Sequence, residues 1–324
     1  MSDFTKITII DLSEHHDNIV RKFANAYSTA GFAYIKNHGI PQTLIDATFE
    51  ASKNFHKLNE AEKQTISLDK NHRGYIPINT STDVNSKLAN VKKPNQSSSF
   101  MMMRESENKS DEYLSGPNQW PEILGFRETL NTYTEQMSIL GQRLISIAAK
   151  ACKANPDELL PAFKLPTIWL RLLHYPPSPT LSPKDLYGSA PHTDFGALTL
   201  LAQDGIGGLQ VQTPNGDWID VPKIDGTFVV NIGDMLNRLS NGFLKSTPHR
   251  VINRSGSERY SIPFFFDPHV NTIIEPLRGT GEPNFEPIHF GDFLRNELGS
   301  SYESHKKIFN KTQLLEYFLL FVIS

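Results

Sequence analysis

A histidine and an aspartate stand two residues apart just before a short apolar run. They are His192 and Asp194, and residues 198–201 have the pattern of a buried strand. If that strand extends back to His192, both side chains point to one face, because strand side chains alternate. His249 is the best candidate for a third ligand. Two histidines and one carboxylate on one face, with the opposite positions open, form the ligand set that suits Fe(II) in a non-haem oxygenase.

The same histidine-x-aspartate spacing also occurs near the N-terminus, where it has a different meaning. His15 is followed two positions later by Asp17, and a helix is expected to begin there. Residues two apart in a helix do not share a face. We therefore interpret the pair at His15 as a solvent-exposed helix start, and only His192 and Asp194 as candidate ligands.

A second pair with chemical potential follows His249 in the chain. Arg259 and Ser261 are two residues apart in a run that has strand character. A strand would place them on one face, where a guanidinium fork and a hydroxyl can bind a carboxylate. A metal site and an acid-binding site built by the same alternation are much harder to obtain by chance than either alone.

Length, charge and cysteine content limit the class of protein. The 324 residues carry a net charge of −3 and a single cysteine, Cys152, which excludes an internal disulfide. The N-terminus has no basic start followed by an apolar core, and the longest apolar run, 317–323, is far short of the roughly 20 residues of a membrane span. We expect a cytoplasmic protein with a small-molecule substrate and without a nucleic-acid or membrane partner; the oligomeric state stays open.

The spacing of apolar residues predicts the elements that must position these side chains. Helical spacing predicts a helix after Ser13, a second over 44–55 and a long helix from about residue 121. Short apolar runs separated by turn residues follow, at 168–175, 208–211, 218–221, 227–232 and 259–266. Many short strands with little helix between them are typical of an antiparallel sandwich or barrel. The fold class we predict is mainly β with flanking helices.

The change in pattern along the chain predicts four regions. Residues 1–120 form a helical and mixed N-terminal region covering the site, and 121–164 contain the long backing helix. Residues 165–275 form the catalytic β core, and 276–324 a C-terminal helical segment whose apolar end packs on the core.

The candidate site residues together resemble a known family signature. His192-Thr193-Asp194, His249 and Arg259-Tyr260-Ser261 are similar to the signature of the Fe(II)/2-oxoglutarate-dependent dioxygenases. Further motifs resemble the isopenicillin N synthase-like branch of that family: Asn37-His38-Gly39-Ile40-Pro41, Arg73-Gly74-Tyr75 and Asn231-Ile232-Gly233-Asp234. The resemblance implies a double-stranded β-helix (jelly-roll) core, with the N-terminal region closing over the site.

The resemblance also implies a role for each residue. His192, Asp194 and His249 would hold Fe(II), 2-oxoglutarate would take two of the open positions, and O2 would take the last. Arg259 and Ser261, with Tyr175 as a third donor, would bind the distal carboxylate of 2-oxoglutarate. The implied reaction hydroxylates or desaturates a small molecule and releases succinate and CO2.

Two alternatives remain open from the sequence. An Fe(II) oxidase or cyclase of the isopenicillin N synthase type would not use 2-oxoglutarate, yet it resembles this chain at the Arg-x-Ser pair too. A ligand-binding protein that has lost turnover is the second alternative, and the intact metal and acid-binding residues argue against it.

The substrate side is less constrained. Candidate substrate-facing residues are Phe100, Met102, Arg171, Phe195 and Phe265, each of which has an equally good interpretation as a structural residue. Leu173 stands where related plant enzymes carry an asparagine. The sequence does not choose among a pyrimidine, a terpenoid, a phenolic and an amino-acid derivative.

Overall fold

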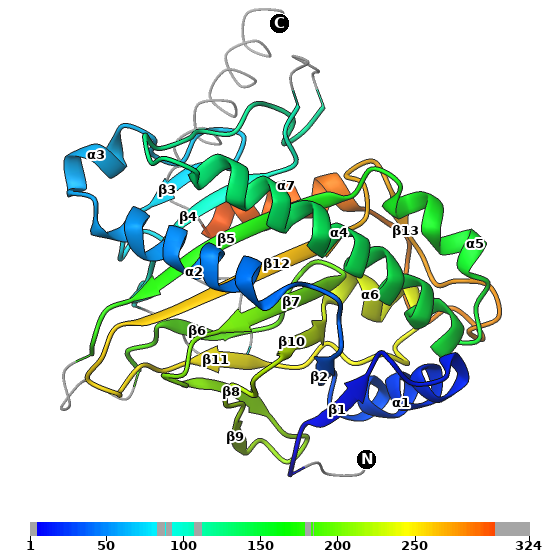
Figure 1. The fold of residues 1–324 in the computed structure, drawn as a ribbon. Coiled ribbons are helices and arrows are strands. Elements are labelled where there is room, and N and C mark those ends of the chain that lie inside the picture. Colours follow the sequence, from blue (N-terminus) through cyan, green and yellow to red (C-terminus); the bar gives the residue numbers. More distant parts are fainter. Residues whose placement is uncertain are drawn as a thin grey trace, which may run out of the picture.

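A large mixed sheet forms the framework of the molecule in the computed structural model, which describes residues 5–82, 88, 93–106, 112–178, 183 and 185–301 (Figure 1). The strand order in this sheet is β1-β2-β10-β7-β12-β5-β4-β3. In chain order these strands are β1 (Thr8–Asp11), β2 (Phe32–Lys36), β3 (Gly74–Ile76), β4 (Ser98–Met103), β5 (Thr167–Tyr175), β7 (Leu198–Gln203), β10 (Thr227–Ile232) and β12 (Arg259–Asp267). β1 and β2 pair in parallel, and the other neighbours pair antiparallel.

A smaller sheet packs against the large one. Its order is β6-β11-β8-β9, with β6 (Ser189–His192), β8 (Leu209–Gln212), β9 (Trp218–Asp220) and β11 (His249–Val251). A compact cluster of buried side chains from both sheets, among them Phe32, Tyr175 and Val211, fills the space between them. Two further short strands, β13 (Ile273–Ile274) and β14 (Ile288–His289), pair with each other.

Helices flank the large sheet (Figure 1). They are α1 (His16–Thr29), α2 (Gln42–Lys57), α3 (Glu60–Gln64), α4 (Phe126–Ala151), α5 (Pro156–Leu159), a 3-10 turn at Leu160–Phe163, α6 (Asp234–Leu239) and α7 (Phe290–Ser301). α2 and α4 pack across β12 and its neighbours. The predicted apolar stripe of the long helix, at spacings of three and four, is buried along α4. This stripe forms the main core with the sheet.

The sequence-based boundaries need three corrections. The long helix begins at Phe126, after Gly125 with a φ of 75°, and not at residue 121. Ser13 does not cap α1, because its backbone N–H and its hydroxyl both donate to Asp11. Residues 98–103, for which no strand was predicted, form the fully buried strand β4.

In the predicted C-terminal helical segment, 276–324, helix α7 begins only at Phe290, after the short strand β14, and extends to Ser301. The apolar run 317–323, which we expected to pack on the core, lies outside the described residues. No helix in the described part of the chain is long and apolar enough to cross a membrane.

Candidate active site

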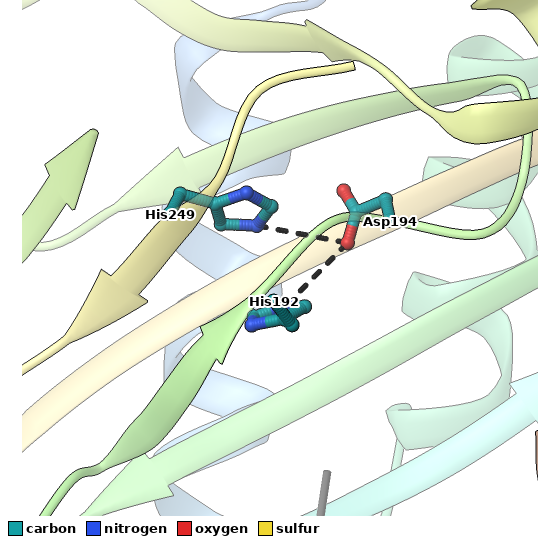
Figure 2. A group of neighbouring side chains, drawn as sticks. All are labelled: His192, Asp194 and His249. Carbon is teal, nitrogen blue, oxygen red and sulfur yellow. Dashed lines mark ion pairs between the residues drawn. The ribbon is translucent and has the colours of Figure 1, made fainter. Parts of the chain in front are cut away.

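The two sheets bring His192, Asp194 and His249 to one place, although 55 positions separate Asp194 from His249 in the chain (249 − 194). His192 ends β6 and His249 begins β11, and the two are register partners in the small sheet. Their rings lie 4.3 Å apart between centroids. The Nε2 atom of each histidine is 3.6 Å from Oδ1 of Asp194, so all three ligand atoms point at a common position (Figure 2).

Asp194 reaches this position from a turn and not from a strand. β6 ends at His192 and β7 begins only at Leu198. Asp194 therefore lies close to His192 as expected, but not because the two residues share a strand. The turn is fixed by the start of α6, where the N–H of Asp234 donates to the carbonyl of Asp194 at 2.7 Å. Gly233 allows this close approach, because a Cβ there would lie 2.3 Å from the carbonyl oxygen of Gly196.

The second oxygen of Asp194 is held by two neighbouring strands. Asn231 Nδ2 donates to Oδ2 at 2.8 Å, and Thr199 Oγ1 donates to the same atom at 2.5 Å. Burial alone would raise the pKa of Asp194. The opposite effect of His249, His192 and the hydrogen bond from Asn231 is larger, so the pKa lies well below its usual range. Asp194 is therefore a carboxylate with Oδ1 turned toward the histidines.

The sequence motif that contains Asn231 resembled the family, but Asn231 was not predicted as a site residue. A buried amide within an otherwise apolar strand was the available signal.

The backbone sets the orientation of both imidazoles. His192 Nδ1 is 2.7 Å from the carbonyl oxygen of Ala190, and His249 Nδ1 is 3.2 Å from that of Thr247. A carbonyl oxygen only accepts, so in each ring Nδ1 carries the proton and Nε2 presents its lone pair. Metal-binding histidines are held in this way. Two imidazole nitrogens and one carboxylate oxygen thus fit an Fe(II) ion.

A cavity of about 80 Å³ adjoins two of the three candidate ligands, His192 and Asp194. Met101, Trp169, Arg171, Phe195 and Phe265 contribute to its wall. Of the candidate substrate-facing residues, Arg171, Phe195 and Phe265 therefore lie where a substrate could meet them.

Phe100 and Met102 do not line the cavity, and the expectation for them is corrected. They lie on the opposite face of β4, 0% and 2% exposed, and Phe100 packs against Phe55 and Phe126 beneath the helices. Strand alternation places Met101, between them, on the cavity side. Four successive apolar residues at 100–103 gave no alternation from which the two faces could be told apart.

Arg259, Ser261 and Tyr175 form a second polar group, inside the structure and away from the wall of that cavity. Arg259 is fully buried, and its Nη1 donates to Ser261 Oγ at 3.2 Å, which confirms the shared face. Its guanidinium lies 4.7 Å from the ring centroid of Tyr175, its register partner on β5. Among the described residues no carboxylate forms an ion pair with Arg259, so its charge suits a ligand carboxylate.

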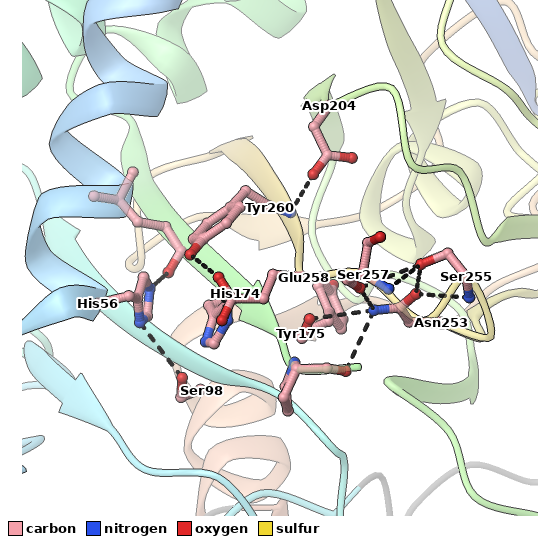
Figure 3. A network of polar contacts seen from close by, with 12 residues as sticks. His56, Ser98, His174, Tyr175, Asp204, Asn253, Ser255, Ser257, Glu258 and Tyr260 are labelled. Carbon is pink, nitrogen blue, oxygen red and sulfur yellow. Dashed lines mark hydrogen bonds and ion pairs between the residues drawn. The ribbon is translucent and has the colours of Figure 1, made fainter. Parts of the chain in front are cut away.

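A loop between β11 and β12 fixes the ends of the strands that carry this group (Figure 3). Asn253 Nδ2 donates to the carbonyl oxygens of Tyr175 at 3.2 Å and Ser257 at 2.9 Å. The backbone N–H of Tyr260 donates to Asp204 Oδ2 at 2.5 Å. The ends of β5 and β12 are thereby held together next to Tyr175 and Arg259.

Two family profiles match the chain over separate ranges. Residues 167–268 match the 2OG-Fe(II) oxygenase superfamily, and residues 7–123 match the non-haem dioxygenase in morphine synthesis N-terminal family. Among curated proteins, a probable iron/ascorbate oxidoreductase of Dictyostelium discoideum is 33% identical over 89% of this chain and 90% of its own length. A homoarginine-6-hydroxylase of Glycine max is 30% identical over 93% of this chain and 98% of its own.

Solved structures are similar over nearly the whole chain. A full-length Neurospora crassa protein crystallised with alpha-KG (2-oxoglutarate) superposes with a TM-score of 0.81 at 30% identity, covering 91% of this chain and 96% of its own. JOX2, solved with 2OG, Fe and JA, gives a TM-score of 0.77 at 29% identity, covering 89% and 83%. The jelly-roll expectation is confirmed. The chain belongs to the 2OG-Fe(II) oxygenase superfamily, in its isopenicillin N synthase-like branch, and is an Fe(II)- and 2-oxoglutarate-dependent oxygenase that acts on a small molecule.

Proposed function

We propose that the protein hydroxylates or desaturates its small-molecule substrate, with release of succinate and CO2, and that His192, Asp194 and His249 hold the iron. The observation that carries the proposal is the convergence of two imidazole Nε2 atoms on one carboxylate oxygen, at 3.6 Å each. When bound, iron and 2-oxoglutarate supply the activation of O2. The chain contributes the placement of these groups.

Each group of residues has a separate task in this proposal. The two histidines and Asp194 would hold the ion and leave positions for other ligands. Asn231 and Thr199 keep Asp194 turned toward the ion through hydrogen bonds to its other oxygen. Arg259 and Ser261 bind the distal carboxylate of 2-oxoglutarate, with the ring of Tyr175 against the guanidinium.

The ring of Tyr175 lies 4.7 Å from the guanidinium carbon of Arg259, measured to the ring centroid. In this proposal its hydroxyl is the third donor to the distal carboxylate of 2-oxoglutarate. The wall of the cavity beside the metal position is partly apolar, so it keeps bulk water away from a bound substrate.

The alternative reaction, an iron oxidase or cyclase without 2-oxoglutarate, has less support. Structures similar to this chain over about nine-tenths of its length were solved with alpha-KG or 2OG. Similar structures contain thymine or JA, and one relative is a homoarginine-6-hydroxylase, so the range of substrates among these relatives does not select one for this chain.

Succinate formation tests the proposal. Purified protein with Fe(II), ascorbate, O2 and labelled 2-oxoglutarate should release succinate when a panel of small molecules is screened, and a true substrate should gain oxygen or lose two hydrogens in equal amount. His249→Ala should abolish the release, while His174→Ala, at a histidine on the other face of the sheet, should retain it. Oxidation of a substrate without any consumption of 2-oxoglutarate would establish the alternative reaction instead.

A further inference from the structure

Arg171 is the one arginine or lysine among the described residues that line the cavity beside the metal position. It lies on β5, two residues after Trp169, so both side chains belong to the cavity face of that strand. Its register partner on β4 is Met101, which also lines the cavity. The guanidinium is therefore built into the centre of the large sheet and not carried on a loop.

The hydrogen bonds of Arg171 leave much of its donor capacity unused. Its Nε donates to Ser99 Oγ at 2.8 Å, and this is the only hydrogen bond recorded for its side chain within the described part of the chain. Ser99 is fully buried, so this bond anchors the inner edge of the guanidinium. Among the described residues, neither terminal nitrogen has a recorded acceptor, so both can donate to a ligand.

The carboxylates on the same wall are already engaged. Asp267 accepts from the backbone N–H of Ala197 at 2.6 Å with one oxygen and from Trp169 Nε1 at 2.9 Å with the other. Asp194 faces His192 and His249. No ion pair of Arg171 with an acid is recorded among the described residues. A half-buried cation without a counter-charge is costly, and a bound anion removes that cost.

The rest of the wall indicates what the anion is attached to. Trp169, Phe195, Phe265 and Met101 give the cavity aromatic and apolar surface next to Arg171. We propose that the substrate is a carboxylic acid with an apolar body, that its carboxylate pairs with the terminal nitrogens of Arg171, and that its body lies against these side chains. This inference rests on the proposed function, and it narrows the substrate to one chemical class.

A second carboxylic acid, 2-oxoglutarate itself, must also bind, and a test has to separate the two. We place 2-oxoglutarate at Arg259, which lies outside the wall of this cavity. If Arg171 served 2-oxoglutarate instead, its loss would weaken 2-oxoglutarate binding directly.

Anaerobic calorimetry on the Fe(II)-loaded protein distinguishes these cases. 2-Oxoglutarate is titrated first, and then phenylacetate, indole-3-acetate and octanoate are each compared with the matching primary amide, which has nearly the same shape and no charge. At least one acid should bind about tenfold or more tightly than its amide, as expected for charge-assisted hydrogen bonds. Arg171→Met should remove this preference and leave the affinity for 2-oxoglutarate unchanged.

The control is Arg127→Met, which removes an exposed guanidinium that rests on Trp120 at 5.4 Å and should change neither affinity. Equal binding of acids and amides, or no binding of any acid, would overturn the inference. A loss of 2-oxoglutarate binding in Arg171→Met would also overturn it and assign Arg171 to the co-substrate. Failure of the unaltered protein to bind 2-oxoglutarate would instead remove the proposed function.

Discussion

In the described part of the chain, two pairs of histidines face each other, and they differ in what surrounds them. His192 and His249 stand 4.3 Å apart between ring centroids in the small sheet, and Asp194 lies 3.6 Å from both. His56 on α2 and His174 on β5 stand 5.0 Å apart beneath the helices (Figure 3). Glu258 is 3.9 Å from His174, and its side chain is 59% exposed.

The direction of the ring nitrogens separates the two pairs further. At the metal position both Nδ1 atoms are engaged by backbone carbonyls, so both Nε2 lone pairs converge. In the other pair, His56 Nε2 is 3.0 Å from the carbonyl oxygen of Leu172, and its Nδ1 faces Ser98 Oγ at 3.4 Å. Both nitrogens of His56 are thus used within the protein. Proximity of two histidines does not make a metal site; a shared carboxylate and Nε2 atoms that converge on one position do.

Removing one histidine from each pair gives the largest contrast. His249→Ala should lower the affinity for Fe(II) by more than about 100-fold, because even residues that only support metal ligands contribute 10- to 100-fold. His174→Ala should leave it unchanged. Anaerobic Fe(II) titration measures both, with thermal unfolding as a check that each variant is folded. Equal losses in the two variants would remove the distinction between the pairs.

The two faces of β4 should differ in how much their side chains contribute to stability. Met102→Ala deletes a side chain that is 2% exposed in the main core, and it should lower the free energy of unfolding by about 2–5 kcal/mol. Met101→Ala should cost less stability, because the cavity already lies on one side of it. Denaturant unfolding of both variants checks the order. A larger loss for Met101→Ala would contradict the assignment of faces.

The hydrogen bond from Asn231 to Asp194 can be removed without replacing a candidate metal ligand. Asn231→Leu keeps the size of the side chain and removes the donor to Asp194 Oδ2. We expect the affinity for Fe(II) to fall by roughly 10-fold, at the lower end of the range for such supporting residues, because Thr199 still donates to the same oxygen. Thr199→Val should act similarly. Unchanged iron affinity in both variants would show that the orientation of Asp194 does not depend on these bonds.

The burial of His56 should affect how the free energy of unfolding depends on pH. Burial, with His174 as a smaller cause, lowers the pKa of His56 to about 3 from 6.5. Below pH 6.5 the unfolded state therefore binds more protons at this residue, and the free energy of unfolding falls as the pH decreases toward 3. The slope is at most about 1.4 kcal/mol per pH unit for this group.

His56→Gln isolates this contribution. Denaturant unfolding of metal-free protein at pH 6.5 and 5.5 should show a smaller decrease for His56→Gln than for the unaltered chain. The same decrease in both proteins would mean that His56 is not held in its neutral form.

Spacing and residue type predicted much of the site, and the reasons for the misses are physical. Arg259 and Ser261 share a face as expected, because a regular strand obeys alternation. Asp194 lies in a turn, where strand alternation does not apply, and it still meets His192 because a backbone hydrogen bond from Asp234 to Asp194 closes that turn. Phe100 and Met102 were misplaced because a strand buried on both faces shows no polar side in its sequence.

Supporting residues were the harder part to predict. Asn231 and Asp267 act through contacts with residues 37 and 70 positions away, and no local pattern marks such pairs. The buried face of α4 was easier to predict, because it is set by the spacing of apolar residues within one segment of the chain.

A crystal structure of the protein grown anaerobically with Fe(II) and 2-oxoglutarate tests the central claim most directly, with anomalous scattering at the iron edge to locate the metal. Our account predicts one iron ion bound by Nε2 of His192, Nε2 of His249 and a carboxylate oxygen of Asp194, and the distal carboxylate of 2-oxoglutarate at Arg259 and Ser261. Iron bound at another position, or these three side chains turned away from the ion, would contradict it.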